Sequence, residues 1–541
     1  MKTKLLDCTL RDGAYITDGY FGEKSIKGII KHLQDANIEM IECGWLKNTV
    51  YSEGSTYYNT PNDFKRYLPD SKKEGTTYVA MIDYNRYDLS HLPLCDGESI
   101  DAIRVVFPQE KVDDGLKLVK PIREKGYKAY LQAANTYGYS DTELIELANK
   151  INNYDVEGVS IVDTFGAMYD HDLERIVILL HRHLRRDIKL GFHSHNNKQL
   201  SFALSIRFID MMIKYWDRDC IVDASLCGMG RGAGNAPTEL LIDYMNDRLH
   251  SGYDTNAILD AVDMYMYRYM RDYSWGYSIP YMLSGKYACH VNNVAYLTQT
   301  HRTRAKDMKT IFENMSGEKR KTYDYDYVED IYHGVINRQV DDSCARQELI
   351  KSMKGRELVL ILPGKSAEDR KSDVLDYISK TEACIVIGIN SLLKGYPYDY
   401  LFFSNEVKYQ LVKDIYSKEL SELKVIVTSN ISSDQEIVVN YDDLTERKWK
   451  YYDNSLILFL ELMRFLSPKR IDIVGFDGYK NRDNNYADKR LEPPINESEL
   501  AHMQNDIEEM FREFALINKG KITIKFLTES PFEKILGGTN A

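Results

Sequence analysis

Short apolar runs alternate with helix-length segments through the first 230 residues of the chain. Eight such runs occur, at 4–7, 40–45, 78–83, 102–107, 128–134, 158–163, 189–195 and 221–226. Segments such as 25–36, 113–125, 142–153 and 173–184 carry apolar residues at helical spacing between them. Eight strand–helix units in about 250 residues are typical of a (β/α)8 barrel. A doubly wound open sheet shares this alternation and is the alternative.

Polar side chains cluster where these apolar runs end, and this favours the barrel. In a (β/α)8 barrel the carboxyl ends of the strands meet at one face, where catalytic groups lie. We therefore expect one shared site formed by residues near these ends, namely Arg11, Asp12, Glu42, Asp83, Gln132, Asp163, His193 and His195.

A second alternation begins after a charged, tyrosine-rich stretch. Apolar runs at 358–362, 383–390, 400–405, 424–430, 437–440, 470–477 and 521–527 are separated by helix-length segments. Strands this apolar predict a doubly wound α/β domain with a parallel sheet. We thus predict a barrel over 1–299, a helical lid or linker over 300–355 and a Rossmann-like domain over 356–541.

Charge and cysteine content narrow the class of partner. The chain of 541 residues carries 70 basic and 82 acidic side chains, a formal net charge of −12. This balance argues against nucleic-acid binding and against an anionic membrane surface, so a small molecule or a protein is the expected partner. The eight cysteines form no Cys-x-x-Cys pair, and we find no targeting or membrane-spanning segment. We expect a cytoplasmic protein and a homo-oligomer.

His193 and His195 are candidates for a metal site. Residues i and i+2 of a strand point to the same face, so both imidazoles project together at the end of an apolar run. Taken alone, the pair is as compatible with two structural or solvent-facing histidines. Asp12 can add a hard carboxylate oxygen, and Arg11 can offer its donors to an oxyanion. A surface Arg–Asp pair is the alternative there, but its position after the first strand favours the site.

A glycine-rich loop follows the eighth run. Four glycines at 228, 230, 232 and 234 let the backbone approach a ligand closely, and we assign Gly232 and Gly234 to substrate binding. Asn235 follows directly. It can cap the predicted helix over 238–249 or turn its carbonyl oxygen to a metal, and the spacing leaves both open.

Three of these motifs resemble signatures of a known superfamily. They are Asp-Cys-Thr-Leu-Arg-Asp-Gly at 7–13, His-Ser-His at 193–195 and Gly-Ala-Gly-Asn at 232–235. They look like those of the DRE-TIM metallolyases, which include 3-hydroxy-3-methylglutaryl-CoA lyase, isopropylmalate synthase and 4-hydroxy-2-oxovalerate aldolase, and the likeness covers about residues 4–300. The resemblance implies that Asp12, His193 and His195 hold a divalent metal, with Asn235 as a fourth ligand. It also implies that Arg11 stabilises an enolate oxygen.

The first motif and residues 275–281 look more like the 4-hydroxy-2-oxoacid aldolases than the acyl-CoA condensing enzymes. One position departs from that pattern. The aldolases usually carry a histidine base three residues after the metal-binding aspartate, and here that residue is Tyr15, a poor base at neutral pH. His290 is our substitute candidate, with a core or surface histidine as the alternative, and Tyr277 is a further catalytic candidate.

The chemistry expected of this site is a metal-dependent aldol reaction between a 2-oxoacid, pyruvate in the first place, and an aldehyde. A carboxylate and two imidazoles suit Mn²⁺, Mg²⁺ or Co²⁺, and Zn²⁺ is also compatible. We assign Glu42, Gln132 and Asp163 to substrate binding. Two alternatives stay open: a Claisen-type condensation with an acyl-CoA, and a barrel that has lost catalysis and serves as a scaffold for the C-terminal domain.

The C-terminal half carries its own candidate site. Gly364, Lys365 and Ser366 open a helix directly after a strand, where amides and a lysine can bind a phosphate; a plain strand-to-helix turn is the alternative. Asn390 and Asp477 end other strands and suggest a polar rim for a nucleotide or sugar. This half loosely resembles Rossmann-like domains of bacterial surface-polysaccharide proteins. The resemblance implies a nucleotide or nucleotide-sugar ligand and an aldehyde derived from a sugar.

Overall fold

The computed structural model describes residues 2–216, 218–301, 303–336, 338–446, 448–479, 485–491 and 497–537. The chain divides into two compact units, residues 1–325 and 326–541. Within the described residues, no helix has the length and apolar character needed to cross a membrane.

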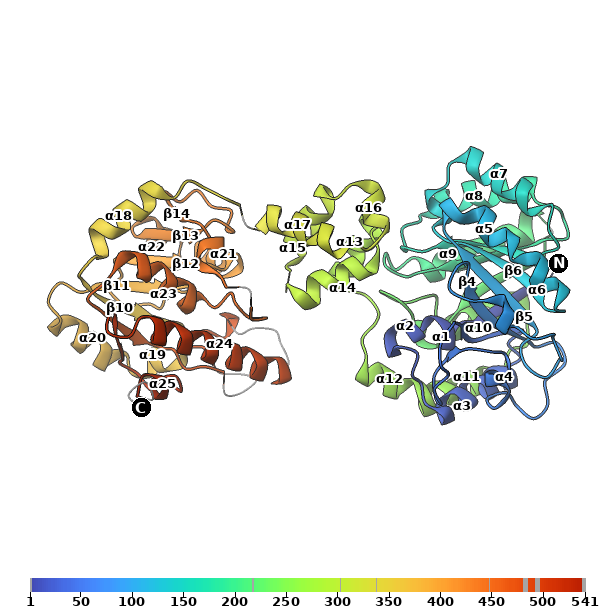
Figure 1. The fold of residues 1–541 in the computed structure, drawn as a ribbon, viewed down its shortest axis with the longest axis horizontal. Coiled ribbons are helices and arrows are strands. Elements are labelled where there is room, and N and C mark those ends of the chain that lie inside the picture. Colours follow the sequence, from blue (N-terminus) through green and yellow to red (C-terminus); the bar gives the residue numbers. More distant parts are fainter. Residues whose placement is uncertain are drawn as a thin grey trace. The chain divides into compact units, whose positions relative to one another are not determined.

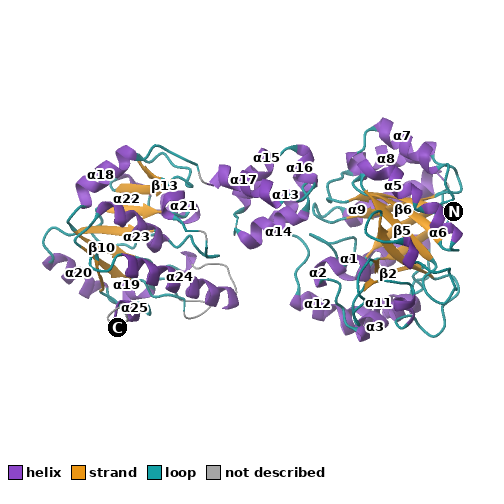
Figure 2. Ribbon diagram, viewed as in Figure 1, coloured by secondary structure: helices purple, strands orange, loops and turns teal. Residues whose placement is uncertain are grey.

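Unit 1 contains a closed barrel of eight parallel strands, as the spacing of the apolar runs predicts. β1 pairs with both β2 and β9, which closes the sheet, and a two-residue strand β3 (Tyr57–Tyr58) extends it beside β2. Figure 2 shows these strands enclosed by helices. The barrel strands are β1 (Thr3–Asp7), β2 (Met40–Leu46), β4 (Thr77–Asp83), β5 (Ala102–Phe107), β6 (Lys128–Ala133), β7 (Gly158–Asp163), β8 (Lys189–Ser194) and β9 (Cys220–Ala224).

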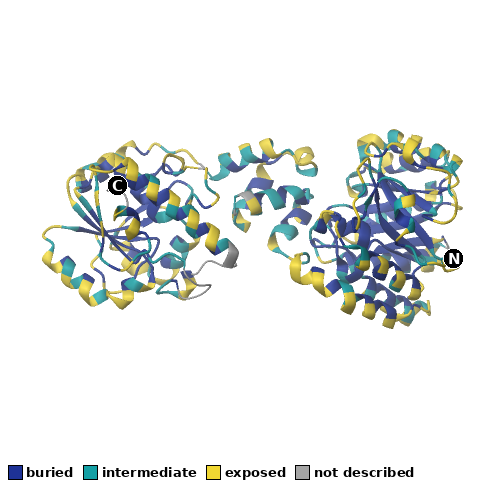
Figure 3. Cartoon of the chain, turned by 60° about the horizontal axis from the view of Figure 1, so that its bottom comes forward, coloured by how far each residue is buried: buried dark blue, intermediate teal, exposed yellow. Residues whose placement is uncertain are grey.

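Helices surround the barrel because each presents one apolar face to the strands. In α3, for example, Ile26, Ile29, Ile30 and Leu33 recur at helical spacing and are fully buried. Figure 3 shows the result, with buried residues concentrated in the strands and exposed residues on the outer helix faces. The helices of this layer are α3 (Glu23–Asp35), α5 (Val112–Lys117), α6 (Val119–Glu124), α7 (Asp141–Ile151), α8 (Asp170–His183), α9 (Ser201–Met211), α10 (Thr238–Leu249), α11 (Thr255–Ala261) and α12 (Tyr267–Asp272), with short helices α1 (Thr9–Asp12), α2 (Ala14–Thr17) and α4 (Asn62–Lys65) in loops.

The inside of the barrel changes from apolar to polar along the strands. Residues two apart in a strand share a face, so the residue two positions after an inward one also points inward. An apolar layer that includes Leu6, Met40, Val79, Ala102, Tyr130 and Ile221 fills one end. In four of these strands the next inward position toward the carboxyl end is polar or charged: Glu42, Arg104, Gln132 and Asp223.

A group of further helices in unit 1 follows the barrel: α13 (Ile279–Tyr287), α14 (Val291–Thr300), α15 (Ala305–Asn314) and α16 (Gly317–Lys321). This group contacts the barrel loops. The ring of His290 lies 6.4 Å from that of Phe165, and a Cβ at Gly232 would come within 3.0 Å of Val291. α17 (Tyr325–Ile336) begins where unit 1 ends. The predicted domain limits at 299 and 355 remain predictions.

Unit 2 is the doubly wound α/β domain that the second alternation predicts. Its seven parallel strands have the order β14-β13-β12-β11-β10-β15-β16. Leu358 and Leu360 of β10 face one hydrophobic cluster and Val359 and Ile361 the other, so helices cover both faces, as Figure 1 shows. The strands are β10 (Glu357–Ile361), β11 (Ile385–Ile389), β12 (Tyr400–Phe403), β13 (Lys424–Thr428), β14 (Ile437–Val439), β15 (Arg470–Val474) and β16 (Thr523–Phe526); the helices are α18 (Ser343–Met353), α19 (Lys365–Asp369), α20 (Lys371–Lys380), α21 (Glu406–Ile415), α22 (Ser417–Ser421), α23 (Ser455–Leu466), α24 (Glu497–Ile517) and α25 (Glu533–Gly537).

Candidate metal centre

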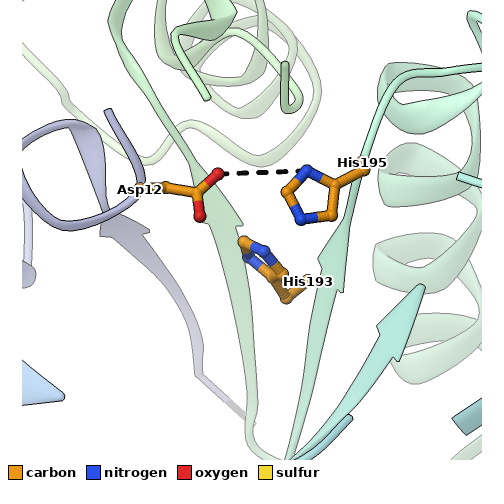
Figure 4. A group of neighbouring side chains, drawn as sticks. All are labelled: Asp12, His193 and His195. Atoms are coloured by element: carbon orange, nitrogen blue, oxygen red, sulfur yellow. Dashed lines mark ion pairs between the residues drawn. The ribbon is translucent and has the colours of Figure 1, made fainter. Parts of the chain in front are cut away.

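Asp12, His193 and His195 meet at the carboxyl end of the barrel strands (Figure 4). Asp12 ends the short helix after β1, His193 lies near the end of β8, and His195 follows that strand directly. One possible ligand atom from each residue lies within 4.8 Å of the others, and all three side chains are buried. The two imidazole rings are 5.1 Å apart and nearly perpendicular, so they approach one point from two directions.

The polar atoms of this group suit a divalent cation. His195 Nδ1 lies 3.9 Å from Asp12 Oδ2, and it is buried without a hydrogen-bond partner among the described residues. Burial lowers the pKa of His195 to about 3, so the ring is neutral and keeps a lone pair for a metal. Burial alone would raise the pKa of Asp12, but Arg11 and the two histidines more than offset it, and the carboxylate stays ionised. A carboxylate with two neutral imidazoles fits Mn²⁺, Mg²⁺ or Co²⁺ as well as Zn²⁺.

Asn235 joins the same group through the glycine-rich loop. Its amide nitrogen donates to Asp12 Oδ2 at 2.8 Å, while its Oδ1 is buried without a partner among the described residues. The loop folds back on itself, because Asn235 N donates to Gly228 O at 2.9 Å and Gly234 has a φ of +85°. α10 begins after Pro237 without a side-chain cap. Asn235 therefore does not cap that helix, and its Oδ1 has no hydrogen-bond partner among the described residues while its Nδ2 contacts the metal-ligand group through Asp12.

A layer of paired charges lies next to the metal-ligand group. Arg104 contacts Glu42 at 3.1 Å and Asp223 at 2.5 Å, and Arg11 contacts Glu42 at 2.7 Å and Asp12 at 2.5 Å. All five side chains are buried. Two guanidinium groups and three carboxylates leave a net charge of −1, which favours a bound cation beside them.

Asp223 fixes the orientation of His193. Its Oδ2 lies 3.0 Å from His193 Nδ1. Arg104 more than offsets the effect of burial and lowers the pKa of Asp223, so this carboxylate is ionised. A carboxylate this close to Nδ1 favours a proton there, which would leave Nε2 as the metal ligand.

Replacing Asp223 by asparagine is therefore expected to weaken metal binding by about 10- to 100-fold, the range for such supporting carboxylates. Competition with a fluorescent chelator for Mn²⁺ measures this affinity. Asp219→Asn is the control, because Asp219 accepts a hydrogen bond from the Lys2 amide in an exposed position. An unchanged affinity in the Asp223 variant would show that His193 does not depend on this contact.

Arg11 is held rigidly beside Asp12. Its Nε and Nη1 contact Glu42 and Asp12, and its carbonyl oxygen accepts the Trp45 indole N–H at 3.1 Å. Burial would lower the pKa of Arg11, but Glu42 and Asp12 raise it well above its usual value. Among the described residues, Nη2 has no acceptor and remains available to a substrate oxygen.

Tyr15 and His290 lie beside the same group. The ring of Tyr15 contacts Trp45 at 5.9 Å and carries the Arg231 guanidinium 3.7 Å from its centre. Burial raises the pKa of Tyr15, which keeps its hydroxyl protonated. His290 Nε2 lies 3.4 Å from Arg231 Nη1, and His290 Nδ1 accepts the amide of Asn292. Burial lowers the pKa of His290 to about 3, with Arg231 and His195 contributing.

Other predicted site residues have internal partners. Glu42 is bound by Arg11 and Arg104. Gln132, with its amide oxygen turned to Arg104 Nε at 2.8 Å, lies in the same layer. Asp163 accepts the amides of Ala167 and Met168, and burial raises its pKa to about 6. The side chains of these three residues are therefore bound by other groups of the barrel.

Tyr277, Gly232 and Gly234 are the remaining predicted site residues of the barrel. The side chain of Tyr277 is 59% exposed, and no described contact connects it with the metal-ligand group. Gly232 has a φ of +68°, and a Cβ there would lie 2.8 Å from Asn197 Oδ1. Gly234 accepts the Asn196 amide at 2.7 Å. Both glycines thus fix the loop that carries Asn235.

In unit 2, four of the predicted residues come together where the chain reverses its winding. β10 lies between β11 and β15, and Gly364, Lys365 and Ser366 follow β10 while Asp477 follows β15. Asp477 Oδ2 accepts the Ser366 amide at 2.7 Å, and Lys365 is exposed. A phosphate would have to displace this carboxylate to reach that amide. Asn390 lies at the end of β11, where its side chain binds Ser404 and Ser455.

Sequence reasoning missed several residues of the centre. Arg104 and Asp223 each interrupt an apolar run at an inward position, between Ile103 and Val105 and between Val222 and Ala224. A charge inside a buried strand needs a partner, and this signal was present in the sequence. Lys47 and Arg231, at the mouth of the barrel, gave no comparable signal, because basic residues in loops are common.

Comparisons with known proteins concern the barrel half of the chain. Residues 108–264 match the HMGL-like family model. The chain is 25% identical over 263 residues to the oxaloacetate decarboxylase of Mycobacterium tuberculosis, which covers 48% of this chain and 74% of that protein. It is 24% identical over 275 residues to 4-hydroxy-2-oxovalerate aldolase 6 of Rhodococcus jostii, which covers 49% of this chain and 74% of that protein. Both names denote carbon–carbon lyases.

Among solved structures, the N-terminal domain of a proposed aldolase from Bacteroides vulgatus is 27% identical, with a TM-score of 0.49, and covers 55% of this chain and 98% of that chain. HMG-CoA lyase from Brucella melitensis is 14% identical, with a TM-score of 0.41, and covers 50% of this chain and 99% of that chain. Residues 108–264 of the barrel are thus similar to the HMGL-like family, and these relatives include an aldolase and a decarboxylase that act on 2-oxoacids.

Proposed function

We propose that the barrel catalyses a metal-dependent aldol reaction, forming or cleaving a carbon–carbon bond between a 2-oxoacid and an aldehyde. Pyruvate is the expected 2-oxoacid. The observation that carries this proposal is the buried group of Asp12, His193 and His195 with the guanidinium of Arg11 held 2.5 Å from Asp12. A carbonyl oxygen bound to a metal at this group would also lie near the guanidinium of Arg11.

A divalent metal held by Asp12, His193 and His195, with Asn235 as a fourth ligand, would polarise the keto group of the 2-oxoacid. Mn²⁺, Mg²⁺ and Co²⁺ are our first candidates. Arg11 supports the same charge change, because its Nη2 donors can meet the keto oxygen as it becomes negative when a neighbouring carbon loses a proton. Glu42 and Asp12 keep the guanidinium in place, so little reorganisation is needed during the reaction.

The proton from the methyl carbon goes to His290 in this proposal. Tyr15 remains protonated, because burial raises its pKa, so it serves as a hydrogen-bond donor and not as a base. Burial keeps His290 neutral, and its Nε2 lies 3.4 Å from Arg231 Nη1. Taking the proton at Nε2 requires the tautomer that carries its N–H on Nδ1, so the Asn292 amide, which Nδ1 accepts in this structure, has to turn away first. In the cleavage direction the same imidazole returns the proton to carbon.

The reactions named for two of the relatives share one intermediate. Cleavage of 4-hydroxy-2-oxovalerate and decarboxylation of oxaloacetate both break a carbon–carbon bond and leave the enolate of pyruvate. Decarboxylation of a 2-oxodiacid is therefore the second candidate function, and the match to the decarboxylase supports it. Carbon dioxide release from oxaloacetate, compared with aldehyde release from 4-hydroxy-2-oxoacids, separates the two.

Exchange of pyruvate methyl protons with deuterium tests the shared step. We expect the protein loaded with Mn²⁺, Mg²⁺ or Co²⁺ to catalyse exchange, followed by proton NMR in D2O, and the protein treated with a chelator to lose it. Absence of exchange with all three metals would contradict the proposal and favour the scaffold alternative. Thiol release from acetyl-CoA with a 2-oxoacid would instead support the Claisen reaction.

For unit 2 we propose a nucleotide or nucleotide-sugar ligand at the carboxyl edge between β10 and β15. The reversal of strand order there supports it, because ligands of doubly wound sheets bind at such a point. We also propose that the aldehyde derives from a sugar used in surface-polysaccharide synthesis. We further propose that the protein forms a homo-oligomer. Binding of nucleoside diphosphates to the full chain and its Ser366→Ala variant tests the site.

A further inference from the structure

Two positive side chains at the mouth of the barrel lack an acidic partner. Among the described residues, no carboxylate lies within 4 Å of the charged nitrogens of Lys47 or Arg231. Lys47 follows β2, and Arg231 lies in the glycine-rich loop after β9. Both are half-buried. Most of the other basic side chains around the centre are paired, as Arg11, Arg86 and Arg104 are.

Aromatic rings hold both cations in place. Lys47 Nζ lies 3.4 Å from the centre of the Tyr57 ring and 5.6 Å from that of Trp45. Arg231 stacks on Tyr15 at 3.7 Å, and the Tyr15 ring in turn packs edge-on against Trp45. Such contacts orient a cation while leaving its hydrogen-bond donors free for an anion.

Lys47 is partly removed from water and lies near other positive charge. Burial lowers the pKa of Lys47 to about 8, with Arg86 and Arg231 contributing and Asp18 and Asp83 opposing. Asp83 contacts Arg86 at 3.7 Å, so its charge is shared. Lys47 is still mainly protonated at pH 7, and two half-buried cations with nearby like charge are stabilised when an anion binds between them.

The cationic pair lies next to the reacting centre but outside the metal-ligand group. Arg231 connects the two sides of the site, because its Nη1 lies 3.4 Å from His290 Nε2 and its guanidinium stacks on Tyr15 at 3.7 Å. The Trp45 ring contacts both groups: the Arg11 guanidinium is 5.9 Å from its ring centre, and Lys47 Nζ is 5.6 Å from it. Because the proposed 2-oxoacid binds beside Arg11, Lys47 and Arg231 remain for the second substrate.

We propose that Lys47 and Arg231 bind a negatively charged group on the acceptor aldehyde, so that the acceptor carries its own carboxylate or phosphate. This inference rests on the proposed aldol reaction and names the class of its second substrate. A bound anion would also offset the effect of Arg231 on His290 and raise the pKa of that base toward its usual range.

Pairs of aldehydes that differ in charge test the inference. With pyruvate and Mn²⁺, kcat/KM is compared for 4-oxobutanoate against butanal and for glyceraldehyde 3-phosphate against glyceraldehyde. We expect the anionic member of at least one pair to be preferred by roughly 10- to 100-fold, the value of one or two charge-assisted hydrogen bonds. The two pairs distinguish a carboxylate from a phosphate.

The variants Lys47→Met and Arg231→Met are expected to reduce that preference at least severalfold, while Lys47→Arg and Arg231→Lys keep it. The preference is a ratio within each variant, so a general loss of catalysis or folding does not affect it. Equal use of charged and neutral aldehydes by the parent protein would overturn the inference. So would a raised KM for pyruvate in both methionine variants with an unchanged ratio, because the pair would then bind pyruvate.

Calorimetry with unreactive alcohols measures anion binding without requiring catalysis. We expect 4-hydroxybutanoate or glycerol 3-phosphate to bind the metal-loaded parent, and the Lys47→Met variant to bind it more weakly, while 1-butanol and glycerol do not bind. If pyruvate exchange is absent but this binding is seen, the proposed function fails and the anion site stands. If exchange occurs but neither anion binds or is preferred, the anion site fails alone.

Discussion

Protein with Asp12 replaced by alanine is expected to bind no divalent metal at micromolar concentrations and to show no exchange of pyruvate methyl protons. Asp12 supplies the only carboxylate of the ligand group identified among the described residues, and it is ionised. Its loss also changes the net charge of the buried network from −1 to zero. We expect metal affinity to fall by more than about 100-fold, since supporting residues alone contribute 10- to 100-fold.

Metal content after equilibrium dialysis against Mn²⁺ measures this effect, and Asp7→Asn is the matched control. Asp7 is a buried carboxylate at the end of β1, but it accepts the Thr9 amide and the Thr238 hydroxyl and is not part of the metal-ligand group. Asparagine keeps an acceptor there, so the control should bind metal like the parent. Equal metal content in the Asp12 and Asp7 variants would refute the site.

The barrel could be predicted because its apolar runs are both short and regularly spaced. β5 coincides with the run at 102–107, and β7 with that at 158–163. The carboxyl ends of parallel strands meet by geometry alone, so the sequence also placed Asp12 and His193 on one face. In unit 2 all seven apolar runs predicted as strands are strands of one parallel sheet, whereas their order comes from the structure.

Pairing between distant residues could not be derived from the sequence. Arg104 and Asp223 are 119 positions apart, and nothing in their local sequence says that they meet. Glu42 illustrates the consequence. It was assigned to substrate binding because it lies near a strand end, but two guanidinium groups already surround its carboxylate. Only the closure of the barrel, which aligns inward positions of β2, β5 and β9, reveals that role.

His290 shows why loops beyond the barrel are harder to predict. The residue lies 95 positions after His195 in sequence, and its ring reaches the centre because α13–α16 pack on the barrel loops. The backbone N–H of His290 donates to Arg320 O at 2.7 Å, which fixes this segment locally. Helical pattern predicts that such helices exist, whereas the face on which they pack depends on contacts that the pattern does not contain.

The variant His290→Asn is expected to slow pyruvate exchange by roughly 10²- to 10⁴-fold, the usual contribution of a positioned base. Asparagine is chosen because the His290 side chain caps α14 by accepting the Asn292 amide, and asparagine is a good helix cap. Metal content should stay at the parent level, since His290 is not part of the ligand group. Exchange rates by proton NMR at saturating Mn²⁺ measure the effect.

His181→Asn serves as the matched control. His181 is also a buried histidine whose pKa is lowered, to about 4, by burial and by Arg218, but it lies on α8, where it contacts Arg218 and Trp216. Circular dichroism establishes that both variants are folded. If His290→Asn exchanges pyruvate protons at the parent rate, another group takes the proton. If it loses metal together with exchange, the imidazole supports the ligand group and is not the base. Loss of exchange with metal retained, in that variant alone, is the result that identifies His290 as the group that moves the proton.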